Sequence, residues 1–140
     1  MEPLIEKKDY TLINGLLKIN EGVRHIPTKC FENYSDIRKI ILPSTLISIG
    51  DSAFSWCINI RHLQLPDSVK YIMHNAFSYC SIETLLLGRN MKYIAEEAFS
   101  HNNIYDVFNN STKLSFIGQS AFYNNKLKSF NINNYPIFIE

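Results

Sequence analysis

Hydrophobic residues recur along this chain with a period of 22–23 residues. A phenylalanine that follows a small residue occurs five times, at spacings of 23, 23, 22 and 23: Phe31, Phe54, Phe77, Phe99 and Phe122. Isoleucines keep the same register before it, at Ile26, Ile49, Ile72, Ile94 and Ile117. Fixed columns of buried residues with variable residues between them indicate a repeat architecture, in which each copy buries its apolar face against its neighbours.

The segments between the phenylalanines predict short strands. Residues 37–43 (IRKIILP), 60–66 (IRHLQLP) and 82–88 (IETLLLG) each contain an apolar-x-apolar core, which is the alternation of a strand buried on one face. Related segments at 17–19, 104–114 and 130–132 bring the number of predicted strands to six. One strand in every 22–23 residues is too sparse for hairpins and favours a parallel stack.

The segments around each Ala-Phe pair predict a turn of helix. Turn-forming residues precede the pair, as in Gly50, Asp51 and Ser52, and we interpret the unit as a one-turn helix with a polar residue near its N-terminus as a cap. The small residue before each phenylalanine allows one coil to pass tightly over the next. The phenylalanines are therefore expected to stack inside one continuous core.

These motifs resemble the BspA-type leucine-rich repeat, with the pattern Leu-x-x-Leu-x-Leu-Pro-x-Ser-Val-x-x-Ile-Gly-x-x-Ala-Phe-x-x-Cys. Residues 37–57 and 60–80 match it almost throughout. The resemblance implies an α/β fold: a right-handed solenoid with a six-stranded parallel sheet on the concave face, and one-turn helices and turns on the convex side. We expect a single domain over 1–140, with an N-terminal cap at 1–15, about five repeats at 16–134 and a C-terminal tail at 135–140.

One repeat departs from this pattern. Residues 104–114 contain one residue more than the corresponding segment of the preceding repeat, and Asn109 stands where a buried leucine belongs. We expect a bulge or a loosened coil there.

The outward-facing strand positions are the candidate binding residues. The residue between the two buried ones of each strand points to the concave surface, and so does the residue two before it. These positions predict a partner-binding face made of Lys18, Lys39, Ile41, His62, Gln64, Thr84, Leu86, Asp106 and Phe108. Exposed Ile41, Leu86 and Phe108 are unusual on a solvated strand and favour an apolar contact, although small exposed apolar patches are also common without function.

A second candidate is an aromatic strip two residues after the phenylalanines, made of Trp56, Tyr79 and His101. These side chains are expected to stack in adjacent coils. The strip has two interpretations: a contact surface for a protein or glycan, or stacking that covers the edge of the core.

The composition of the chain argues against some classes of function. The chain has 140 residues and a net charge of +1, which gives no electrostatic basis for binding nucleic acid. Its short apolar runs predict no membrane insertion. The sequence as given carries no signal peptide, so we expect a cytoplasmic protein, or a cell-surface one if it is a fragment of a longer exported chain.

Chemistry-bearing motifs point away from catalysis. There is no Gly-rich phosphate loop, HExxH or GxSxG motif, and the four histidines fall in different columns. We therefore expect no enzyme activity, no cofactor and no metal. Cys57 and Cys80 occupy one slot in adjacent coils, and Tyr34, Asn102 and Asn125 occupy it in the others. The asparagines indicate that the slot favours a small, partly polar side chain, and we expect free thiols.

The leading hypothesis is a non-enzymatic scaffold that binds a protein partner through the concave strand face. The alternative is an adhesion or glycan-binding fragment of a cell-surface protein that uses the aromatic strip. The raw edge of the C-terminal coil is also expected to permit weak self-association.

Overall fold

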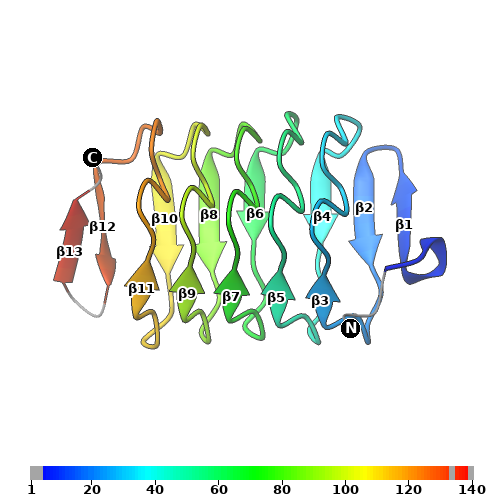
Figure 1. Ribbon diagram of the computed structural model, residues 1–140, viewed down its shortest axis with the longest axis horizontal. Coiled ribbons are helices and arrows are strands. Elements are labelled where there is room, and N and C mark those ends of the chain that lie inside the picture. The colour runs from blue at the N-terminus through cyan, green and yellow to red at the C-terminus, as the bar shows by residue number, and fades with distance from the viewer. Residues whose placement is uncertain (1–4, 133–134, 139–140) are drawn as a thin grey trace.

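The chain winds into a solenoid with two walls of short strands stacked along its length (Figure 1). The computed structural model describes residues 5–132 and 135–138. The first wall contains β2 (Leu16–Ile19), β4 (Lys39–Ile41), β6 (His62–Gln64), β8 (Thr84–Leu87), β10 (Asp106–Asn109) and β12 (Ser129–Ile132). The second wall contains β3 (His25–Ile26), β5 (Ser48–Ile49), β7 (Tyr71–Ile72), β9 (Tyr93–Ile94) and β11 (Phe116–Ile117). The predicted solenoid of stacked parallel strands is confirmed.

The first wall contains all six predicted strands, but they do not form the single six-stranded sheet that was expected. β4 joins β2, and β6 joins β8 and β10, in parallel ladders, whereas no ladder links β4 to β6. β12 pairs instead with β13 (Tyr135–Phe138), antiparallel. β4 and β6 each pair on one side only, and β12 finds its partner in the segment that directly follows it.

The second wall is a continuous parallel sheet in the order β11-β9-β7-β5-β3. Each strand ends in one residue of the isoleucine column, for example Ile49, which lies opposite Ile26 and Ile72. The sequence pattern identifies this column as buried but not as a strand, because a two-residue strand has no alternation to detect.

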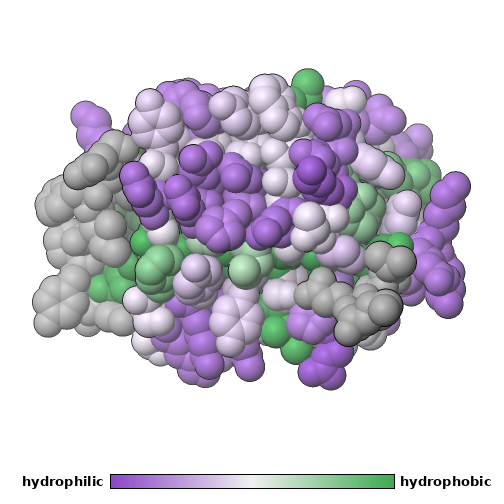
Figure 2. Space-filling view, viewed as in Figure 1, coloured by the Kyte–Doolittle hydropathy of each residue, from purple (hydrophilic) through white to green (hydrophobic). Residues whose placement is uncertain are grey.

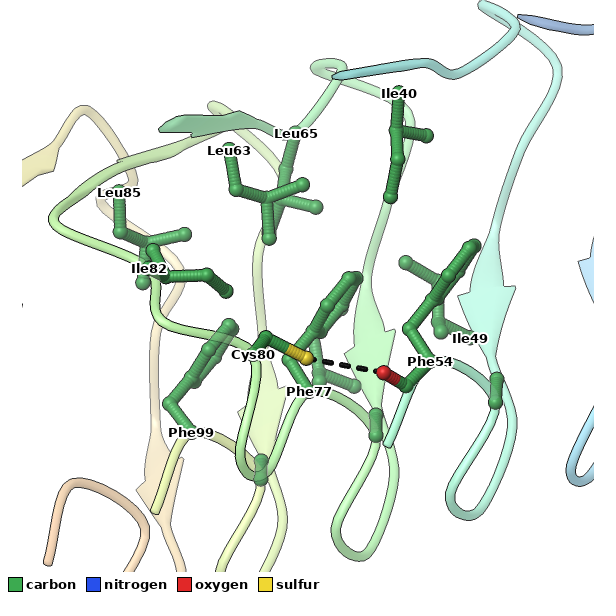
Figure 3. Packing of buried hydrophobic residues seen from close by; sticks show 14 of the residues in the cluster. Ile40, Ile49, Phe54, Leu63, Leu65, Phe77, Cys80, Ile82, Leu85 and Phe99 are labelled. Carbon is green, nitrogen blue, oxygen red and sulfur yellow. Dashed lines mark hydrogen bonds between the residues drawn. The ribbon is translucent and has the colours of Figure 1, made fainter. Parts of the chain in front are cut away.

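The five repeating phenylalanines stack inside one core, as predicted. Neighbouring ring centroids lie 5.3, 5.0, 5.5 and 5.4 Å apart along the series from Phe31 to Phe122, and the planes of Phe54 and Phe77 differ by 5°. Figure 3 shows Phe54, Phe77 and Phe99 entering the same interior from successive coils. The column runs through the interior that the two walls enclose, so each coil completes the core of its neighbours.

The Ala-Phe units form hydrogen-bonded turns and not the expected one-turn helices. The N–H groups of Ala53 and Ser55 donate to carbonyls three residues back in the same coil, but those of Phe54 and Trp56 donate to Ala76 and Ser78 in the next coil. In an α-helix, consecutive N–H groups after the first turn all donate to carbonyls four residues back in the same segment. Here alternate residues bond the turns of adjacent coils, and Ser52 (φ 53°) and Trp56 (φ 64°) adopt left-handed backbone conformations. Among the described residues, the only helical segment is η1 (Lys7–Asp9), a single 3-10 turn.

The bulge expected near Asn109 is absent. β10 pairs with β8 in unbroken register, from Asp106 opposite Thr84 to Asn109 opposite Leu87. The extra residue is accommodated after the strand, where the Ser111 hydroxyl donates to the Met91 carbonyl at 2.6 Å. This coil is nevertheless less covered than the one before it, because Val107 and Asn109 are half-buried and not buried.

Hairpins flank the first wall at both ends. β1 (Tyr10–Ile13) pairs antiparallel with β2 through Asn14 and Gly15, whose φ angles of 49° and 80° fit the Asn-Gly turn typical of a two-residue hairpin. At the other end, β13 covers β12 and uses residues 135–138 of the segment predicted as a tail. Residues 139–140 of that segment lie outside the described residues, and self-association at this end stays a prediction.

Candidate interaction surface

The outward side chains of the first wall form a face that we call the strand face, defined by the nine residues predicted for partner binding. Its middle row alternates with residues that are buried or half-buried. Ile41 is 40% exposed while the adjacent Ile40 is buried, and Phe108 is 54% exposed. Leu86 lies in register between Gln64 and Phe108 on the neighbouring strands and is half-buried. The apolar side chains of this row are therefore partly exposed to solvent.

A polar row lies beside it. His62, Thr84 and Asp106 lie opposite one another on β6, β8 and β10, and the Nδ1 of His62 is 2.6 Å from the Oγ1 of Thr84. Lys39 occupies the equivalent position on β4 and is exposed. The strand face therefore has a basic end at β4 and an acidic group at β10.

A hollow of about 820 Å³ lies on this face, over β4, β6 and β8. It brings together seven of the nine predicted residues, namely Lys39, Ile41, His62, Gln64, Thr84, Leu86 and Phe108. Lys18 and Asp106 lie outside its lining. Figure 2 shows the opposite face, over the second wall, where hydrophilic residues cover most of the surface between smaller hydrophobic areas.

The hollow also includes residues that the repeat pattern did not identify. Glu21 lies at its edge, and its carboxylate accepts the backbone N–H of Ser44 at 3.0 Å and the Ser44 hydroxyl at 2.8 Å. These hydrogen bonds stabilise the charged form, so the pKa of Glu21 is lowered. No repeated column marks this position, so only the structure reveals it.

The aromatic strip stacks as predicted. The rings of Trp56 and Tyr79 lie 4.1 Å apart and 3° from parallel, and those of Tyr79 and His101 lie 4.3 Å apart and 6° from parallel. Within the strip, the stacked rings cover one another's faces, which are the surfaces that a sugar ring would contact. This geometry favours stacking that covers the core edge, and binding of a glycan by the strip stays a prediction.

The comparisons with known proteins agree with this architecture. A family model described as the BspA type leucine rich repeat region matches residues 24–140 in six copies. The chain belongs to the BspA-type leucine-rich repeat family. A solved structure, the leucine-rich repeat protein of T. pallidum, has a TM-score of 0.51 and 19% identity over 83% of this chain and 86% of that one, which shows the shared fold. No curated protein matches the sequence significantly.

The side chain three residues after each repeating phenylalanine bonds one coil of this BspA-type chain to another. The Cys57 and Cys80 thiols are free, and each donates to a phenylalanine carbonyl of the preceding coil, Cys80 to Phe54 at 3.0 Å (Figure 3). In the next coil the Nδ2 of Asn102 donates to the Phe77 carbonyl at 2.8 Å. Thiol and amide thus fill one structural role. Burial raises the pKa of the Cys57 thiol to about 12, which makes it a poor nucleophile.

Two further features bear on chemistry. Within residues 5–132 and 135–138, no group of three or more His, Cys, Asp or Glu side chains is placed to hold a metal ion. Over the same residues, no helix combines the length and the apolar character needed to cross a bilayer. On the strand face, the exposed apolar residues Ile41 and Phe108 and the charged Lys39 line one hollow.

Proposed function

We propose that this chain is a non-enzymatic scaffold that binds a polypeptide partner through the strand face. The observation that carries the proposal is that exposed Ile41 and Phe108 and half-buried Leu86 line the hollow, on strands whose intervening residues are buried or half-buried. Ladders of backbone hydrogen bonds fix these strands, so the apolar groups are held in place before a partner arrives. Preorganisation of this kind lowers the entropy lost on binding.

The size of the face sets the expected affinity. Six strands, about 4.8 Å apart where they pair and with outward residues along each, present on the order of 400 Å². A stable protein interface buries roughly 800 Å² on each partner. The strand face alone is therefore suited to weak, reversible association, and tighter binding needs contacts on the flanks of the solenoid.

The proposal is tested by capturing partners from the organism's own extract. The triple variant Ile41→Ser, Leu86→Ser and Phe108→Ser removes the apolar row without touching a buried residue. The control, Tyr71→Ser with Tyr123→Ser, removes side chains of similar exposure, 39% and 50%, that lie off the strand face.

We expect the triple variant to lose proteins that the wild type captures and the control to retain them. Circular dichroism melts of both variants establish that the fold is intact. If the triple variant captures the same proteins as the wild type, the strand face is not the binding surface.

A further inference from the structure

The hollow lies over a seam in the first wall. β4 and β6 line it from either side, but they belong to different ladders, and Figure 1 shows them visibly further apart than β6 and β8. The Leu65 N–H donates to the Leu86 carbonyl on β8, and alternate residues of a strand direct their amides to opposite neighbours. The amides of His62 and Gln64 are therefore directed towards β4, where no ladder receives them.

Charge is distributed along the same face. Lys18 on β2 and Lys39 on β4 are exposed at one end, and Asp106 on β10 is at the other. None of the three takes part in the ion pairs found among the described residues. Arg61, beside the face, is paired with Glu83 at 2.7 Å and adds no net charge. Glu21 lies near Lys18 and offsets part of its charge, whereas Lys39 lines the hollow itself.

The distance from Lys39 to the apolar row sets the length of the segment that can contact both. Three strand intervals separate β4 from β10. The two intervals within the β6–β8–β10 ladder are about 4.8 Å each and the unpaired β4–β6 interval is wider, so the separation is at least roughly 14 Å. An extended polypeptide advances about 3.3 Å per residue, so four or more residues cover that distance. A segment lying along the solenoid axis therefore reaches from Lys39, across the seam, to Leu86 and Phe108.

We propose that the hollow binds an extended segment of a partner polypeptide that carries an acidic residue at the Lys39 end and an apolar residue about four positions away, against Leu86 and Phe108. The segment covers the seam and shields its backbone groups from water. This inference rests on the proposed function, because it names the partner chemistry of the same face. Opposite charge at Lys39 sets the orientation, and burial of the apolar residue supplies most of the affinity.

The first test is selection from a displayed library of random linear ten-residue peptides by the wild-type chain. We expect enriched peptides to contain Asp or Glu separated by three to five positions from Leu, Ile or Phe. Lys39→Glu should weaken the enriched peptides about tenfold, as expected for loss of a charge pair. Lys29→Glu, which makes the same charge change on an exposed lysine of the opposite turns, should leave their affinity unchanged.

The outcomes that would overturn this inference differ from those that would overturn the proposed function. If the library yields no enriched peptide, or peptides without an acidic preference, or if Lys39→Glu binds them as well as the wild type, the inference is overturned. Loss of captured proteins in the Ile41, Leu86 and Phe108 variant would still support the proposed function, so the two failures are distinguishable.

The second test is amide hydrogen exchange measured by NMR. In the free protein, the amides of His62 and Gln64 should exchange faster than that of Leu86, which lies within the β6–β8 ladder. An enriched peptide at saturating concentration should slow the His62 and Gln64 amides about tenfold or more, because it covers the seam. Unchanged exchange at these two amides with peptide bound would show that the segment does not lie over the seam.

Discussion

The side-chain Oδ1 of Asn102 accepts the backbone N–H of Cys80 from the preceding coil at 3.0 Å, and it also accepts that of Ile82 at 2.9 Å. One residue, Ser81, separates Cys80 from the next buried isoleucine, Ile82, whereas two residues separate Cys57 from Ile60 one coil earlier. There the Cys57 N–H donates to Phe54 and the Ile60 N–H donates to Cys57 itself. The choice of asparagine or cysteine therefore follows the length of the preceding coil, because only the shorter segment leaves N–H groups that need an acceptor.

This relationship predicts that replacing the asparagine of the slot costs more stability than replacing the cysteine. Asn102→Cys removes the acceptor of two buried N–H groups and should lower the free energy of unfolding by about 2–4 kcal/mol. Cys80→Ala removes one weak S–H bond and should cost about 1 kcal/mol. Urea denaturation measures both values. Equal losses in the two variants would contradict the acceptor role of Asn102.

The stacked phenylalanines predict the largest single loss of stability. Phe77 is fully buried between Phe54 and Phe99, so Phe77→Ala should lower the free energy of unfolding by about 3–5 kcal/mol. Phe77→Leu keeps most of the buried volume and should cost clearly less. A calorimetric melt of each variant provides the comparison, and a loss below about 1 kcal/mol for alanine would show that the column is not a continuous core.

Buried thiols predict a loss of stability at alkaline pH. Burial raises the pKa of Cys30 from 9.0 to about 11 and that of Cys57 to about 12, because the thiolate is poorly solvated in the fold. The unfolded chain releases these protons first, so their contribution is fully present below pH 9 and is lost as the pH rises from 9 towards 12. Between pH 8 and 11, the free energy of unfolding should fall more steeply for the wild type than for Cys57→Ser. Parallel curves would exclude a buried thiol at Cys57.

The left-handed turn positions predict a stabilising substitution. Lys29 has φ 58° and an exposed side chain, and the equivalent position two coils on is Asn75, with φ 55°. Because asparagine tolerates this conformation better than lysine, Lys29→Asn should raise the free energy of unfolding by about 0.5–1 kcal/mol. Thr28→Asn, one residue away, is the control. A thermal melt in which both variants shift alike would remove the conformational explanation.

The sequence predicts the parts of this fold that depend on repeated buried side chains. Leu63 and Leu65 reveal a strand by their alternation, and Phe54 and Phe77 reveal a stack by their spacing. The turns are different, because their alternating backbone bonds to the next coil leave no side-chain signature. Trp56 has a left-handed backbone conformation that the sequence does not indicate, because bulky residues rarely have a positive φ.

The candidate site also has features that the sequence predicts and features that it does not. The exposure of Ile41 and Phe108 follows from alternation along their strands and could be predicted residue by residue. The seam between β4 and β6 could not, because the strand segments on either side of it have the same pattern as those of paired strands. Glu21 lies in a connection outside the repeated columns, so its place at the edge of the hollow depends on the path of the chain.

The alternating bonds of the turns also determine how the molecule responds to tension. Each coil is bonded only to the coil before it and the coil after it, and the bonds of both walls and of the turns run along the axis. A force that pulls the two ends apart along that axis therefore falls on one inter-coil junction at a time. Such a solenoid extends by peeling in small successive steps at low force, and it opens first at the junctions that lack a ladder in the first wall, β4–β6 and β10–β12.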